Sequence, residues 1–248
     1  MKTSIDVILK TLLGACFLLG FNSSLFAQDC LLYESFNDNL IDIKWNASAT
    51  HPVDFQCAEQ NGRLEFPSLS ENSGKEFFAG VISNGWKINM LEDWRVSIDY
   101  NLDFNSPTYG DTGIGFIVAF DYDISFPTLF TGLSLSGGTS NFGFGDSEYE
   151  VVRFWQDGDS TIQISGDRPY VQSTVYVWYD AELDCISYTS PGFSPLTVCG
   201  VRALSSQTSA YLGLAGYSFG LVPQSPGNQA WVDDFCLVYG DLVGPLVG

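Results

Sequence analysis

Carboxylates spaced one residue apart recur along this 248-residue chain. In an extended strand, residues i and i+2 point to the same side, so such a pair presents its oxygens together. Asp121 and Asp123 follow an apolar run at residues 113–120. At a strand end they would supply paired oxygen ligands for a hard cation such as calcium. Asp121 and Asp123 are therefore candidate metal ligands, with a plain acidic strand end as the alternative.

Two further acidic sets alternate in the same way. Glu148 and Glu150 lie at the entry of an expected strand, whereas Asp180, Glu182 and Asp184 cross an expected turn. Glycoside hydrolysis needs one protonated and one ionised carboxyl on the two sides of the scissile bond. The turn residues are more simply interpreted as solvated side chains. Neither set predicts a catalytic pair.

Nucleophilic catalysis finds no support in the sequence. His51 is the only histidine, and it precedes Pro52 in an early loop. No G-x-S-x-G motif accompanies it. Zinc is disfavoured because no two cysteines have the C-x₂₋₄-C spacing. We assign no catalytic residue.

Two groups of aromatic residues could stack on sugar rings. The first is Trp155 with its neighbours Arg153 and Gln156, and the second is Tyr176 with Trp178. Alternation over residues 174–179 separates the second pair from an apolar set on the other face of the strand. Core packing is the alternative interpretation, because aromatic rings routinely fill sandwich cores.

Alternation with period two also defines the expected elements. Apolar residues occupy every second position of residues 94–104, as in a strand with one buried and one wet face. Asn61-Gly62 and Asp157-Gly158 are typical of tight hairpin turns. Further strands are expected at residues 31–36, 53–58, 63–66, 77–83, 114–122, 133–135, 149–156, 161–165, 174–179, 185–189, 196–201, 211–217 and 231–239. Strands this short bury enough apolar surface only when two sheets face each other, which predicts an all-β, two-sheet antiparallel β-sandwich.

The first 27 residues have the pattern of a signal peptide. Lys2 and Lys10 supply positive charge, a short apolar run comes next, and Ala27 ends a small-residue exit. Residues 28–248 are then a single sandwich domain of a secreted or cell-surface protein, with the periplasm also open. No later stretch is long and apolar enough for a transmembrane helix. Lipoprotein anchoring at Cys16 is the alternative, because residues 13–16 resemble a lipobox.

The charge is strongly acidic, with 29 acidic against 10 basic residues and a formal net charge of −19. A distributed negative surface repels nucleic acid and anionic lipid, so no nucleic-acid partner is expected. Solubility outside the cell is one explanation of the excess. Calcium binding is the functional one.

Several segments together resemble the concanavalin A-like lectin/glucanase domains of exported bacterial proteins, which are jelly-roll β-sandwiches. They are the ESFN at 34–37, Trp45, the NGRLEF at 61–66, the VWYD at 177–180 leading to CISY at 185–188, the YLGLAG at 211–216 and the WVDDF at 231–235. The resemblance covers nearly the whole of residues 28–248. It implies the fold more strongly than a function, because lectins, hydrolases, lyases and adhesion modules share it.

The resemblance also implies pairings. In that topology the first and last strands are neighbours, which would join Cys30 to Cys236, while Cys185 and Cys199 flank a short return and could bridge adjacent strands. Cys57 would then stay free. The segment 113–123 is similar to the metal-site strand of legume-type lectins, although the histidine expected downstream is absent.

The catalytic motifs of the related enzymes are missing. The E-x-D-x-x-E of the hydrolases has no match, and the Gln-Ile-His of alginate lyases is replaced by Gln163-Ile164-Ser165. We therefore expect a non-catalytic carbohydrate-binding or surface adhesion module facing a polysaccharide or cell-surface glycan. A divergent polysaccharide-degrading enzyme is the second expectation, and a purely structural surface protein is the third.

Overall fold

The computed structural model describes residues 30–49, 57–66, 77–103, 109–120, 134–136, 149–156, 159–167, 172–189, 195–202, 207–221 and 229–244. The chain divides into two compact units, residues 1–30 and 31–248, and all of the described strands belong to the second unit. The expected signal peptide at residues 1–27 and the lipobox at Cys16 lie outside the described residues.

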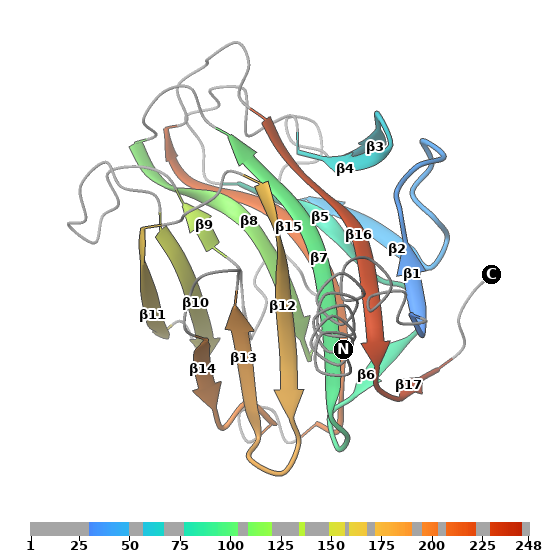
Figure 1. Ribbon diagram of the computed structural model, residues 1–248, viewed down its shortest axis with the longest axis vertical. Helices are drawn as coiled ribbons and strands as arrows, with labels where there is room; N and C mark the ends of the chain where they lie inside the picture. Colours follow the sequence, from blue (N-terminus) through green and yellow to red (C-terminus); the bar gives the residue numbers. More distant parts are fainter. Residues whose placement is uncertain are drawn as a thin grey trace, which may run out of the picture. The chain divides into compact units, whose positions relative to one another are not determined.

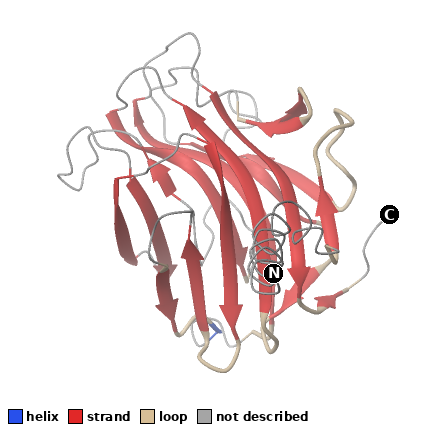
Figure 2. Ribbon diagram, in the orientation of Figure 1, coloured by secondary structure: helices blue, strands red, loops and turns tan. Residues whose placement is uncertain are grey.

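Seventeen strands make up the elements of the described residues (Figures 1 and 2). In chain order they are β1 (Leu32–Glu34), β2 (Trp45–Ala49), β3 (Ala58–Gln60), β4 (Arg63–Glu65), β5 (Phe77–Ser83), β6 (Lys87–Asn89), β7 (Trp94–Asp103), β8 (Tyr109–Ala119), β9 (Ser134–Ser136), β10 (Tyr149–Gln156), β11 (Asp159–Asp167), β12 (Gln172–Asp180), β13 (Cys185–Thr189), β14 (Leu196–Cys199), β15 (Ser209–Leu221), β16 (Gln229–Tyr239) and β17 (Leu242–Val243). All of the strand pairings are antiparallel.

The larger sheet has eight strands. Its order is β14-β13-β12-β7-β16-β4-β3, with β1 also pairing with β16 (Figure 1). The expected strand at residues 94–104 is β7, where the apolar residues at 94, 96, 98 and 100 are buried and the residues at 95, 97 and 99 are partly exposed. One face of this sheet is therefore turned to the core and the other is an outer face.

The second sheet has six strands, in the order β17-β6-β15-β5-β2, with β8 pairing with β15. Gly80 of β5 is required at its position, because a Cβ there would lie 2.1 Å from the carbonyl oxygen of Leu214. β9, β10 and β11 form a separate three-stranded sheet in the order β11-β10-β9.

Aromatic side chains join the two larger sheets across the core. Trp45 of β2 makes an edge contact with Phe235 of β16, with ring centroids 5.2 Å apart. Trp94 of β7 lies 6.2 Å from Phe116 of β8. Both contacts link the six-stranded sheet to the eight-stranded one, so the predicted two-sheet antiparallel sandwich is confirmed.

The predicted turn at Asn61-Gly62 is also confirmed. Its residues have φ angles of 56° and 73°, and it joins β3 to β4. Asp157-Gly158 lies outside the described residues, between β10 and β11.

Candidate functional site

The outer face of β12 carries the aromatic pair that the sequence singled out. Val175, Val177 and Tyr179 are at most 2% exposed, whereas Tyr176 and Trp178 between them are partly exposed. Neither of the two rings belongs to the buried core. The core-packing alternative is therefore wrong for this pair, and both rings lie on the outer face of the eight-stranded sheet.

Arg95 of the neighbouring strand β7 completes what we call the aromatic patch, made of Arg95, Tyr176 and Trp178. Trp178 is directly opposite Arg95 in the β12–β7 register. The guanidinium carbon of Arg95 lies 4.8 Å from the ring centroid of Tyr176, which is a cation–π contact. On the other side of β12, the hydroxyls of Ser187 and Thr197 share a hydrogen bond of 2.8 Å. Aromatic surface and hydrogen-bonding groups are thus adjacent on one sheet face.

An acidic group lies farther along the same face. Asp99 of β7 is directly opposite Asp233 of β16, and the Thr174 hydroxyl donates to Asp99 Oδ1 at 2.5 Å. Tyr33 donates through its hydroxyl to Asp234 Oδ1. These contacts assemble three carboxylates, Asp99, Asp233 and Asp234, which we call the outer acidic group.

Burial and the nearby negative charges disfavour the charged forms of Asp99 and Asp233. Burial raises the pKa of Asp233 to about 6, and the negative charges of Asp234 and Asp99 act in the same direction. Burial also raises the pKa of Asp99, despite its hydrogen bond from Thr174. The hydrogen bond to Asp234 raises the pKa of Tyr33 to about 12.

A second arginine–aromatic contact is found beyond the outer acidic group. The guanidinium carbon of Arg63 on β4 lies 4.7 Å from the ring centroid of Trp231 on β16. Arg63 is also bound to Glu65, with its Nε 2.8 Å from Oε1. Sequence reasoning missed Arg63, Trp231 and the outer acidic group as candidate site residues. The alternation of polar residues over 95–99 was a sequence signal for Asp99, one member of the outer acidic group.

The other predicted sugar platform is on a different sheet. Arg153, Trp155 and Gln156 belong to β10 of the three-stranded sheet. The β10–β11 register places Arg153 opposite Ile162, Trp155 opposite Ser160 and Gln156 opposite Asp159. The structure therefore assigns the five predicted residues to two sheets.

The predicted metal ligands cannot be placed in the same way. Asp121 and Asp123 lie outside the described residues, immediately after Phe120. Within the ranges that the structure describes, no group of three or more His, Cys, Asp or Glu side chains is arranged to hold a metal ion.

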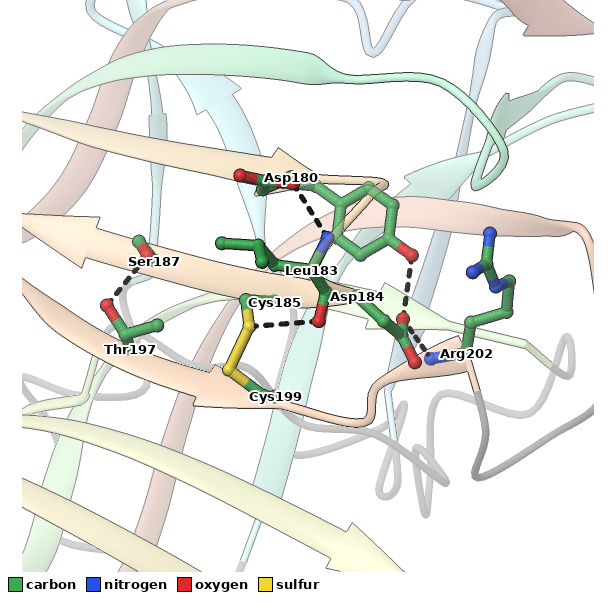
Figure 3. The surroundings of a disulfide bond; sticks show 9 residues. Asp180, Leu183, Asp184, Cys185, Ser187, Thr197, Cys199 and Arg202 are labelled. Carbon is green, nitrogen blue, oxygen red and sulfur yellow. Dashed lines mark hydrogen bonds between the residues drawn. A yellow bond between two sulfur atoms is a disulfide. The ribbon is translucent and has the colours of Figure 1, made fainter.

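The alternating carboxylates at 180–184 have structural roles in the β12–β13 turn (Figure 3). Asp180 Oδ1 accepts a hydrogen bond from the Leu183 N–H at 2.9 Å. Asp184 Oδ1 accepts from the Tyr179 hydroxyl at 2.7 Å and from the Arg202 N–H at 2.8 Å. They are turn residues, as their spacing indicated. His51 and Glu148 lie outside the described residues.

The cysteines stabilise the eight-stranded sheet. Cys185 and Cys199 form a disulfide between β13 and β14, where they are directly opposite each other (Figure 3). Cys30 and Cys236 are also disulfide-bonded, and Cys57 is free and buried. Burial raises the pKa of the Cys57 thiol to about 12, so it is unreactive. Disulfides of this kind fit an extracellular or lumenal protein.

No protein-family model matches the chain, and no curated protein matches it. Solved structures do match. The carbohydrate recognition domain of Emp47p is 14% identical, with 82% of this chain and 90% of that one covered and a TM-score of 0.53. The exoplasmic/lumenal domain of VIP36, in its Ca²⁺/Man3GlcNAc-bound form, is 11% identical, with coverages of 84% and 88% and a TM-score of 0.52. Lectin II from Ulex europaeus is 10% identical, with coverages of 84% and 98% and a TM-score of 0.52.

At these identities the likeness concerns the fold alone. No helix among the described residues has the length and apolar character needed to cross a membrane. Sheet order, cross-core packing and structural neighbours agree on the architecture. The chain is a concanavalin A-like jelly-roll β-sandwich, the fold of legume-type and cargo lectins.

Proposed function

We propose that this chain is a non-catalytic carbohydrate-binding or surface adhesion module that binds polysaccharide or cell-surface glycan through the aromatic patch. The observation that carries the proposal is the partial exposure of Tyr176 and Trp178 beside Arg95. The lectin-fold neighbours support carbohydrate binding at the level of the fold.

The patch has the chemistry that glycan recognition uses. Sugar rings stack their apolar C–H faces on aromatic rings, and their hydroxyls need hydrogen-bonding groups close by. Tyr176 and Trp178 are two residues apart on one strand face, which separates their side chains by about 7 Å. The two rings thus offer consecutive stacking surfaces to one glycan chain. Thr197 supplies an exposed hydroxyl near them, and this hydroxyl is hydrogen-bonded to the buried Ser187.

A divergent glycoside hydrolase is the second candidate, and one observation favours it. Asp99 and Asp233 face each other, and burial raises the pKa of Asp233 to about 6, which is the type of pair that hydrolysis uses. Both residues lie on a sheet face and are not part of the apolar cavity lined by Ile98 and Tyr100. We therefore place binding ahead of catalysis. A purely structural surface role is the third candidate.

Export is part of the proposal. We infer that residues 1–27 are a cleaved signal peptide and that the rest is secreted or held at the cell surface, where disulfides persist. Calcium at Asp121 and Asp123 also stays a proposal, supported by their spacing and by the calcium-bound form of VIP36.

Affinity electrophoresis through gels containing single soluble plant, algal or bacterial polysaccharides tests the patch. The wild-type protein should be retarded by at least one of them. Replacing Trp178 or Tyr176 by Ala should weaken the retardation at least about tenfold, because buried aromatic anchors dominate binding energy.

Tyr211 provides the matched control. It lies on β15 of the six-stranded sheet, where the Lys87 ammonium is 4.3 Å from its ring centroid, so it is also an aromatic residue in a cation–π pair. Tyr211→Ala should bind like the wild type. If Tyr211→Ala lost polysaccharide binding and Trp178→Ala kept it, the binding site would have to be assigned to the six-stranded sheet. Release of reducing sugars that Asp233→Asn abolishes would favour the hydrolase.

A further inference from the structure

Two glutamates point toward the core side at the edge of the eight-stranded sheet. Glu34 ends β1 directly opposite the buried Phe235, and Glu59 of β3 is directly opposite the buried Leu64. Glu34 is 9% and Glu59 is 7% exposed. A carboxylate in such a position is unfavourable unless it is paired with positive charge or fully hydrogen-bonded.

Four carboxylates gather here, namely Glu34, Asp38, Asp42 and Glu59, and the nearby Lys44 forms ion pairs with only two of them. Lys44 Nζ lies 2.9 Å from Glu34 Oε2 and 3.0 Å from Asp42 Oδ2. Asp38 and Glu59 form no ion pair within the described ranges. Lys44 therefore offsets the charges of Glu34 and Asp42. Asp38 and Glu59 have no such cation among the described residues.

Glu59 is bonded through one of its two oxygens. Its Oε1 accepts the N–H groups of Asp38 and Asn39 at 2.9 and 3.0 Å, which ties the loop at residues 35–44 to β3. Its Oε2 is buried, and no donor among the described residues reaches it. Burial raises the pKa of Glu59 to about 7, and a side-chain hydrogen bond with Asp38 and the charges of Asp38 and Glu34 act in the same direction. The Asp38 and Glu59 carboxyl groups therefore lie within hydrogen-bonding reach of each other.

We propose that Asp38 and Glu59 bind a divalent cation, with calcium as the chemically preferred ion. A hard cation would satisfy the buried Oε2 and offset the repulsion between the two carboxylates. Main-chain carbonyls of residues 35–44 and water would complete the shell, because calcium takes 6–8 oxygen ligands and accepts both kinds. With two carboxylates the affinity should be about 10⁻⁴–10⁻³ M, the range of extracellular modules. This site shares no residue with the aromatic patch or with the proposed ligands Asp121 and Asp123.

An alternative explanation needs no ligand. Charged residues that point inward at a sheet edge discourage pairing with another chain. That role requires only the charge, and it predicts no response of the protein to calcium.

Thermal unfolding at pH 7.5 distinguishes the two explanations. After treatment with EGTA, 10 mM calcium should raise the Tm of the wild type by about 3–6 °C, half-maximally at about 0.1–1 mM. Magnesium at the same concentration should give a clearly smaller rise. Glu59→Gln keeps the acceptor for the Asp38 and Asn39 N–H groups, so it should fold and should lose the part of the calcium response that this site contributes. Asp38→Asn is the second variant, with the same expectation.

Controls locate the effect. Asp233→Asn removes another carboxylate whose pKa burial raises, and it should keep the full calcium response. The double variant Asp121→Asn/Asp123→Asn removes the other proposed calcium site, so the response that it keeps reports on Asp38 and Glu59, and adding Glu59→Gln to it should abolish that response. The proposal is overturned if the wild type shows no response, if the response survives when Glu59→Gln is added to the Asp121→Asn/Asp123→Asn variant, or if Asp233→Asn loses it. The polysaccharide gels without calcium report on glycan binding separately, so the two proposals can fail independently.

Discussion

Neighbouring residues of β12 face opposite sides of the sheet and should differ in their effect on stability. Val177 faces the core at 2% exposure, while Trp178 faces outward. Val177→Ala should therefore lower the free energy of unfolding by about 1–3 kcal/mol, through lost burial and a cavity. Trp178→Ala should cost at most about 1 kcal/mol, because it removes no core contact. Urea denaturation of both variants measures the difference, and equal losses would mean that Trp178 supports the fold rather than a ligand.

Asp233 should make stability depend on pH. Its pKa is 3.8 in a model peptide and about 6 in the folded protein, where it faces Asp99 and Asp234, with Arg63 also near. The folded state holds the proton more tightly than the unfolded state, so this group lowers stability as pH rises from about 4 to about 6. Above that window the effect is complete.

Asp233→Asn isolates this contribution. Calorimetric Tm values between pH 4 and 7 should fall less steeply with pH in the variant than in the wild type. Identical slopes would contradict the assignment. The comparison with the wild type cancels titrating groups that do not interact with Asp233, such as Glu59.

At the level of residues, the sequence predicted which side chains of a strand share one face, because that depends only on alternation. It separated Tyr176 and Trp178 from the buried face of their strand. It could not find the Arg95–Tyr176 contact or the Asp99–Asp233 pair, because these depend on which distant strands become neighbours. Glu59 gave no signal either, since a glutamate in a short polar segment looks exposed until its strand register is known.

At the level of elements, we expect the disulfide between β13 and β14 to stabilise the folded protein. Cys185 and Cys199 are separated by 14 residues, and a loop of that size corresponds to about 3 kcal/mol of stabilisation. The double variant Cys185→Ser/Cys199→Ser should lose about that much in urea unfolding. Cys57→Ala, which removes a free thiol, serves as the control. A loss below about 1 kcal/mol would show that neighbouring hydrogen bonds, such as Ser187 with Thr197, hold the strands without the bridge.

Strands were predictable where apolar residues alternate or run together. The expected strand at 94–104 matches β7, and the expected strand at 149–156 is β10. β2 and β6 were missed, because WNASA contains only one large apolar residue and KIN is three residues long. β2 is a strand through its pairing with β5, in which Trp45 is opposite Ser83. Local composition does not carry that information.

At the level of the whole molecule, short strands and turn residues predicted two facing sheets. The order of strands within the sheets, and the separate β9–β11 sheet, were not predictable from one sequence, because many orders bury the same residues. The pairing of β1 with β16 agrees with the topology that the resemblance implied. A direct bond between Cys30 and Cys236 stays a prediction.

The fold also limits what can be transferred from its neighbours. At 10–14% identity, this chain and the lectins share an arrangement of strands, and their ligand residues do not carry over. A site has to be argued from this chain's own side chains. On the described residues, the aromatic patch on the outer face of the eight-stranded sheet has the strongest case.

The most direct test of carbohydrate binding is a glycan array probed with the purified protein, with and without calcium, alongside the Trp178→Ala/Tyr176→Ala double variant. We predict that the wild-type protein binds a defined set of related glycans and that the double variant loses this binding. Absence of binding in both conditions would contradict a carbohydrate-binding function and would leave the structural role in front.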